Sequence, residues 1–194
     1  MPITPRRLER IRTVLSRRQP DLTLALNNIH DPHNVSAILR SCDAFGVHTV
    51  HLLYTSEGFP VMGKRSSASA RKWVGLERHT SPVEMVRTLD AQGHHLIAAS
   101  FDPTARPLPE WDLTRPTAVI LGNEHRGVDQ QLTDLVPDHL YIPMQGMVQS
   151  FNVSVAAALI LYEAWRQRSA RGMYEKSPFS EQEMERLVRE WCEK

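Results

Sequence analysis

Cysteine is scarce in this chain, with only Cys42 and Cys192 among its 194 residues. Two cysteines make no disulfide framework, and their separation does not fit the paired spacing of a zinc site. No apolar run reaches the roughly 18 residues of a membrane-spanning helix, and the N-terminal P-I-T-P-R-R lacks the apolar segment of a secretory signal. We therefore expect a cytoplasmic protein that is not inserted in a membrane, with one main domain.

Glycine-rich nucleotide loops are also missing. No G-x-G-x-x-G follows a predicted strand, which argues against a dinucleotide-dependent oxidoreductase. The sequence G-N-E-H-R-G at 122–127 has the spacing of a phosphate loop but lacks the Lys-Ser/Thr that should follow. The scattered His48, His51, His94 and His95 show no ligand spacing, so we expect no metal.

Positive charge is unevenly distributed, although the net charge is only +1. Residues 1–20 contain six arginines and a single acidic residue. A second basic stretch, free of acidic residues, occupies 64–72, and a third group consists of Arg166, Arg168 and Arg171. Each cluster alone is compatible with a solvated helix face, but three clusters together favour contacts with nucleic-acid phosphates.

Apolar periodicity and helix signals alternate with short apolar runs along the chain. Helices are predicted at 6–18, 34–44, 81–92, 152–170 and 181–192, with Asn34, Ser81 and Ser180 as N-caps. Strands are predicted at 22–26, 47–54, 72–76, 95–100 and 117–122, and another ends at 140–143; 55–71 and 103–116 are predicted loops. This alternation predicts an α/β fold with a mostly parallel sheet.

Ligands in parallel sheets bind outside the carboxyl ends of the strands. Ser100, Gly122 and Ile142 each end a predicted strand, so we expect them to line one rim of the sheet. After Ile142, the polar residues Ser150 and Asn152 precede a helix that is apolar on almost every side. Because such a helix is normally buried and polar groups at its mouth need partners, this segment predicts a functional site.

Three spaced segments resemble a known family. They are N-V-S-A-I-L-R at 34–40, L-G-N-E-H-R-G-V at 121–128, and I-P-M with S-F-N-V-S-V-A-A-A between 142 and 158. In this order they look like the motifs of the SPOUT family of S-adenosylmethionine-dependent RNA methyltransferases, in its 2′-O-ribose branch. The resemblance extends over nearly the whole chain, and within that branch it is to the tRNA (guanosine-18) 2′-O-methyltransferases.

The resemblance implies an architecture as well as an activity. Helices would cover both faces of the sheet, and the C-terminal part would form a trefoil knot. The expected organisation is a basic helical extension at 1–20, a SPOUT domain at 21–168 and a C-terminal helical extension at 169–194. Family members are homodimers with the active site close to the subunit interface, so a homodimer that binds tRNA is expected.

The resemblance also assigns site residues. The catalytic set would be Arg40, Asn34, Glu124, Ser150 and Asn152. S-adenosylmethionine would be held by Ser100, Gly122, Ile142, Met144 and Phe151, largely through backbone groups near Ile142 and Met144. Phe151 stands where leucine is usual in the family. The tRNA would contact Arg7, Arg10, Arg18, Arg166 and Arg168.

Structural interpretations of these residues remain open from the sequence alone. Arg40 lies off the apolar stripe of its helix and is compatible with a plain surface residue. Asn34, Ser150 and Asn152 fit residues that cap the first N–H groups of a helix, and Glu124 fits an ion pair with Arg126. His33 fits either a turn or an RNA contact. Two rival functions also remain: 2′-O-methylation of another tRNA position or of ribosomal RNA, and non-catalytic RNA binding.

Overall fold

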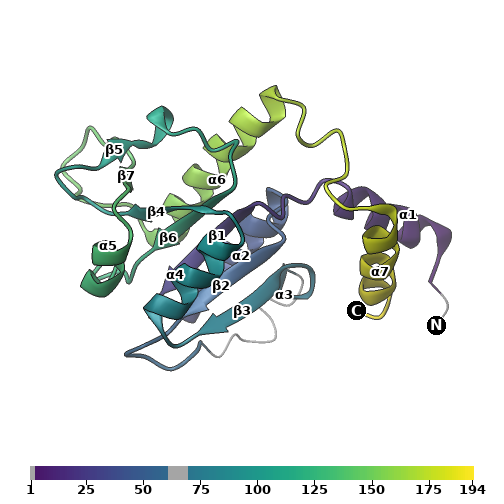
Figure 1. Ribbon diagram of the computed structural model, residues 1–194, viewed down its shortest axis with the longest axis horizontal. Coiled ribbons are helices and arrows are strands. Elements are labelled where there is room, and N and C mark those ends of the chain that lie inside the picture. Colours follow the sequence, from purple (N-terminus) through teal and green to yellow (C-terminus); the bar gives the residue numbers. More distant parts are fainter. Residues whose placement is uncertain (1–2, 61–69) are drawn as a thin grey trace.

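The chain folds around a seven-stranded sheet in which all strand pairs are parallel (Figure 1). The structure is a computed structural model that describes residues 3–60 and 70–194, so most of the basic stretch at 64–72 lies outside the described residues. The spatial order of the strands is β3-β2-β1-β6-β4-β7-β5. Their bounds are β1 Leu22–Asn27, β2 Thr49–Leu53, β3 Gly75–His79, β4 His95–Ala99, β5 Arg106–Pro107, β6 Thr117–Leu121 and β7 His139–Tyr141.

Helices cover both faces of this sheet, as predicted (Figure 1). The helices are α1 Pro5–Leu15, α2 Pro32–Ala44, α3 Ala70–Trp73, α4 Pro82–Ala91, α5 Gln130–Leu135, α6 Val153–Ala170 and α7 Glu181–Cys192, with a short 3-10 helix at Leu108–Glu110. Successive β1 side chains point to opposite faces. Leu24 packs into the core formed with α2 and α6, whereas Ala25 packs into the core formed with α4 and α5. All of β1 is therefore buried, as expected of a central parallel strand.

Local capping chemistry explains where the helices begin. Ser81 and Ser180 accept hydrogen bonds from the backbone N–H groups of Glu84 and Glu183, which confirms both predicted caps. The cap predicted at Asn34 is wrong. Asp31 caps α2 instead, because its carboxylate accepts from the N–H of His33 and a proline follows at the first helical position. This shift leaves the Asn34 side chain available for other contacts.

The two terminal helices, α1 and α7, lie side by side at one end of the molecule (Figure 1). Their apolar faces form a separate cluster of buried residues: Ile11, Leu15, Leu187, Val188 and Trp191. An ion pair joins Arg12 to Glu185 with 2.6 Å between Nη1 and Oε1. Both predicted terminal helices are thus present, although α1 ends at Leu15 rather than at residue 18.

Three local predictions are wrong. Lys72 and Trp73 belong to α3 rather than to a strand, and the edge strand begins only at Gly75. The predicted loop at 103–116 contains the short β5, and the short helix α5 was not predicted. None of the described helices is long and apolar enough to cross a membrane. The knotted threading and the exact domain boundaries stay predictions.

Candidate active site

The carboxyl ends of β6, β4 and β7 lie next to one another in the sheet. Gly122 follows β6, Ser100 follows β4 and Ile142 follows β7, so the sheet brings together the three strand ends that the sequence predicted. Gly122 is required by packing, because a Cβ built there would lie 2.0 Å from the backbone carbon of Gly127. The chain after β6 therefore folds back tightly on itself at this rim.

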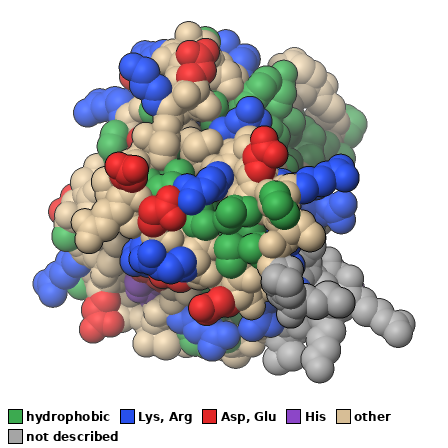
Figure 2. Space-filling view, turned by 90° about the vertical axis from the view of Figure 1, so that its right-hand side faces the viewer, with side chains coloured by type: hydrophobic (Ala, Val, Ile, Leu, Met, Phe, Trp, Pro, Cys, Tyr) green, Lys and Arg blue, Asp and Glu red, His purple; other side chains and the backbone are tan. Residues whose placement is uncertain are grey.

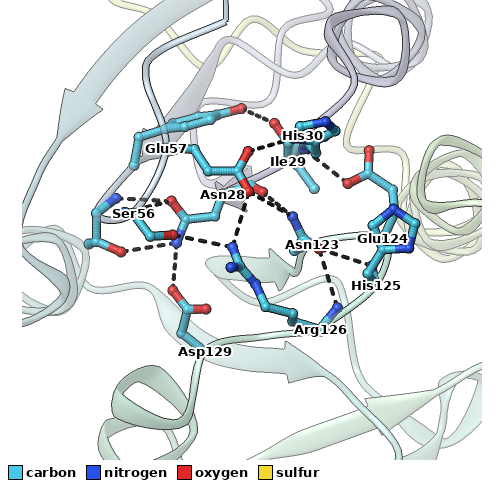
Figure 3. Close-up of polar contacts among 12 residues, drawn as sticks. Asn28, Ile29, His30, Ser56, Glu57, Asn123, Glu124, His125, Arg126 and Asp129 are labelled. Atoms are coloured by element: carbon cyan, nitrogen blue, oxygen red, sulfur yellow. Dashed lines mark hydrogen bonds and ion pairs between the residues drawn. The ribbon is translucent and has the colours of Figure 1, made fainter.

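The loop after β6 is a closed turn held by Asn123. The backbone N–H of Asn123 donates to the carbonyl of Gly127, and the N–H of Gly127 donates to the carbonyl of Asn123, both at 2.9 Å. Gly127 has a positive φ of 72°. The Asn123 side chain accepts from the N–H groups of His125 and Arg126 and donates to the carbonyl of Asn28 at 2.7 Å (Figure 3). This turn is thereby fastened to the end of β1.

A second set of contacts joins the same turn to the segments after β1 and β2. Asp129 accepts from the Asn28 side chain at 2.6 Å, and Arg126 forms an ion pair with Glu57 at 3.1 Å (Figure 3). Asn28 has φ +50°, a conformation that asparagine tolerates better than most residues. Sequence reasoning missed these supporting residues, apart from Arg126, for which an ion pair with Glu124 was one open alternative; Arg126 pairs with Glu57 instead. The Asn-Asn pair that ends β1 was their only local signal.

Glu124 connects the turn to the start of α2 and to the segment before it, and Figure 3 shows its contact with His30. Its carboxylate accepts from the Asn34 side chain at 2.8 Å and from the backbone N–H groups of His30 and Asp31 at 3.0 and 3.2 Å. Burial acts to raise the pKa of Glu124, but these hydrogen bonds outweigh it and hold the pKa below its usual value. Glu124 is therefore a carboxylate at neutral pH.

The Asn34 amide links Glu124 to the start of α6. Its Oδ1 accepts from the Asn152 side chain at 3.1 Å. Asn152 in turn caps α6 by accepting from the N–H of Ser154 at 2.8 Å. The Asn152 side chain therefore both caps α6 and donates to Asn34. Glu124, Asn34 and Asn152 form one hydrogen-bonded chain across three elements that are far apart in the sequence.

Arg40 and Ser150 stand outside this chain of hydrogen bonds. Both side chains are exposed, and neither forms a hydrogen bond or ion pair within the described part of the molecule. Arg40 lies on α2, six residues after Asn34. Ser150 does not cap α6, so that alternative for Ser150 is not supported. A guanidinium without a protein partner remains available to a ligand.

The segment 142–151, which joins β7 to α6, carries the remaining predicted cofactor residues. Among the described residues, no hydrogen bond involves its backbone groups. Ile142 and Met144 are half-buried and Phe151 is 39% exposed. Close by, Ser100 Oγ lies 2.7 Å from His139 Nδ1 at the start of β7. Unpaired backbone donors and acceptors beside apolar side chains suit a planar heterocycle such as adenine.

Two predicted RNA contacts do not agree with the structure, because Arg18 and Arg168 are completely buried. Arg18 donates to the carbonyls of Val47 and Trp73 and forms an ion pair with Asp43 at 2.5 Å. Arg168 likewise donates to the carbonyls of Leu113 and Arg115 and forms an ion pair with Asp21 at 2.6 Å. Both guanidinium groups thus hold loops together and are not available to phosphates.

The other predicted RNA contacts are exposed. Arg7 and Arg10 lie on α1, and Arg166 lies on α6, where it pairs with Glu163 at 2.7 Å. Figure 2 shows basic side chains spread over the face of the terminal helices and mixed with acidic and apolar ones. His33 is also exposed at the start of α2. Exposure keeps these residues as candidates for RNA contacts.

Comparisons with known proteins agree with this geometry. Residues 21–162 match the SpoU rRNA Methylase family. The chain is 44% identical to a tRNA (guanosine(18)-2′-O)-methyltransferase of Thermus thermophilus, over 98% of both chains. It matches the crystal structure of the A. aeolicus TrmH/SpoU tRNA modifying enzyme with a TM-score of 0.90 and 36% identity, over 97% of this chain and 95% of that one. The SpoU methyltransferase AviRb of Streptomyces viridochromogenes, solved in complex with AdoMet, matches with a TM-score of 0.70 and 29% identity, over 80% of this chain and 64% of that one.

Proposed function

Because the chain belongs to the SpoU methylase family, we propose that it transfers a methyl group from S-adenosylmethionine to the ribose 2′-OH of guanosine 18 in tRNA. The observation that carries this proposal is the hydrogen-bonded chain of Glu124, Asn34 and Asn152, which lies beside the knot-forming loops expected in this family. The near-full-length similarity to tRNA enzymes favours tRNA over ribosomal RNA as substrate. The cytoplasm is the expected location, since Cys42 and Cys192 are free thiols.

The rim formed by the loops after β4, β6 and β7 fits S-adenosylmethionine. Backbone groups of 142–151 would bind the adenine edge, and Ile142, Met144 and Phe151 would contact its faces. Gly122 would let the turn after β6 approach closely, since no side chain fits there. When bound, S-adenosylmethionine supplies an electrophilic methyl group.

Methylation of a ribose hydroxyl requires that the hydroxyl lie in line with the methyl donor and lose its proton as it attacks. Arg40 is proposed to bind the phosphate beside the target ribose and thereby orient the hydroxyl. Its planar guanidinium suits bidentate phosphate binding and stays charged at neutral pH, which makes it a poor base. Glu124 and Asn34 are proposed to hold the start of α2 in position, so that Arg40 is presented correctly.

Dimerisation is proposed to occur through α6. One face of this helix is buried in the domain, but a second face exposes large apolar residues at helical spacing, each 37–52% accessible: Val155, Leu159, Tyr162 and Trp165. Exposed apolar residues in a row on one helix commonly mark a protein–protein interface, so we propose that a second copy of the chain packs against them. Substituting Leu159→Glu should produce monomers in sedimentation experiments, whereas an unchanged assembly would contradict an α6 interface.

The role of Arg40 is tested by Arg40→Ala, with Arg87→Ala as a matched control. Both arginines are exposed on helices, but Arg87 lies on α4, on the opposite face of the sheet from α2. Arg40→Ala should abolish methyl transfer while calorimetry shows unchanged binding of S-adenosylmethionine, and Arg87→Ala should retain both. Near-normal turnover of Arg40→Ala would remove this residue from the mechanism.

A further inference from the structure

A cluster of metal-ligating side chains lies away from the proposed active site, at the edge of the sheet. His51 of β2, and Glu77 and His79 of β3, each contribute one ligand atom, and these three atoms lie within 4.8 Å of one another. The parallel register pairs His51 with Glu77 and Leu53 with His79, so all three ligand side chains project from one face. Among the described residues, no other group of this kind is present.

We propose that His51, Glu77 and His79 form a binding site for a divalent transition metal such as Zn²⁺. His51 Nδ1 lies 3.0 Å from His79 Nε2 and 3.5 Å from Glu77 Oε2. Zinc bonds of about 2.0–2.2 Å in tetrahedral geometry separate neighbouring ligand atoms by about 3.3 Å. The two separations from His51 bracket that value. The Glu77 and His79 ligand atoms lie farther apart, within 4.8 Å of each other, so a rotation of the exposed Glu77 side chain would complete the site.

The surroundings of the cluster suit a bound cation. His51 is 2% exposed, which restricts its ring, whereas Glu77 is 46% exposed and leaves a path from solvent.

The simpler interpretation is a hydrogen bond between two neutral rings, in which one proton lies between His51 Nδ1 and His79 Nε2. This hydrogen bond explains why the two histidine rings lie together, but it gives no role to the Glu77 carboxylate, which lies 3.5 Å from His51 Nδ1. Two histidines and one carboxylate with an open fourth position form a recognised zinc ligand set. The proposed ion would cross-link the edge strand β3 to β2.

The first test uses the full chain after removal of metals with a chelator. Zn²⁺ is titrated in competition with a chromophoric chelator, and one ion per chain is expected. His79→Gln and Glu77→Gln should each weaken binding by at least about tenfold. The matched control is His95→Gln. His95 is also a half-exposed histidine beside a carboxylate, Asp138, but it lies outside the cluster, so this variant should bind zinc as the unaltered protein does.

A measurement on the unaltered protein makes the test independent of any folding defect in the variants. Zinc should shift the ¹⁵N NMR signals of His51 Nδ1 and His79 Nε2 specifically, because these nitrogens would lose their hydrogen bond and bind the metal. Absence of zinc binding, unchanged ring signals, or equal affinity in His79→Gln would each overturn the proposal. Equal loss of affinity in His95→Gln would also overturn it, by moving the ion elsewhere.

Discussion

Truncation of Arg168 should destabilise the fold severely, in contrast to its predicted role in RNA binding. The side chain is 0% exposed and sits at a junction of three segments. It donates to the carbonyls of Leu113 and Arg115 at 2.8 and 3.0 Å, to Gln19 Oε1 at 2.9 Å and to the Asp21 carboxylate at 2.6 Å. Removing the cation leaves the Leu113 carbonyl, Gln19 Oε1 and the Asp21 carboxylate without a donor among the described residues, whereas the Arg115 carbonyl keeps its hydrogen bond from Thr117 Oγ1.

The expected loss for Arg168→Ala is about 3–5 kcal/mol in the free energy of unfolding, as for other broken buried ion pairs. Because the Asp21 side chain is 34% exposed and water can reach it, the lower end of that range applies. Arg166→Ala is the matched control, since Arg166 is 57% exposed and, within the described part of the chain, pairs only with Glu163. It should cost about 0.5 kcal/mol.

Urea unfolding followed by circular dichroism measures both variants, and filter binding measures their affinity for tRNA. The structural account predicts that Arg168→Ala unfolds at much lower urea than Arg166→Ala. If Arg168→Ala instead unfolded like the unaltered protein and lost only tRNA affinity, the burial argument would be refuted and the RNA contact restored.

Three further predictions follow from other parts of the fold. Gly122→Ala should lower the melting temperature and abolish cofactor binding, because its Cβ meets backbone at 2.0 Å and overpacking costs about 1–3 kcal/mol or more; a normal melting curve would contradict the packing argument. Burial, aided by Arg18, lowers the pKa of His48 to about 4, so the unfolded chain binds its proton first as the pH falls below 6.5. His48 should therefore contribute about 2 kcal/mol to the loss of stability between pH 6.5 and 4. The loss should be smaller by that amount in His48→Gln, and identical urea profiles against pH would refute this. Replacing Arg7 and Arg10 by Ala should weaken tRNA binding and reduce its dependence on salt by about one unit of slope per lost phosphate contact, whereas an unchanged slope would assign both to plain surface.

Much of the fold was predictable because its signals are local. Ser81 and Ser180 precede glutamates and apolar positions at helical spacing, and both helices begin where these signals predict. Lys72 and Trp73 were assigned to the strand predicted at 72–76, yet Trp73 packs against the terminal helices as part of α3. Asn34 resembles a cap in isolation, but the adjacent Asp31 and its proline take that role.

The candidate site was only partly predictable, since burial is a property of the whole fold. Arg18 and Arg168 look like other arginines of basic clusters, and only the tertiary structure shows that carbonyl groups surround them. In the same way, His51 and His79 are too far apart in the sequence to suggest ligand spacing. The register of β2 and β3 brings their ring nitrogens to 3.0 Å.

The most direct test of the proposed function is transfer of labelled methyl from S-adenosylmethionine to an unmodified tRNA transcript, followed by mapping of the labelled nucleotide. The account predicts label on the 2′-oxygen of guanosine 18. It also predicts no label on a matched transcript that carries 2′-deoxyguanosine at that position, because only the acceptor oxygen is missing. Label at another nucleotide, or equal label on both transcripts, would contradict the proposed substrate, and no transfer to any RNA would contradict the proposed activity.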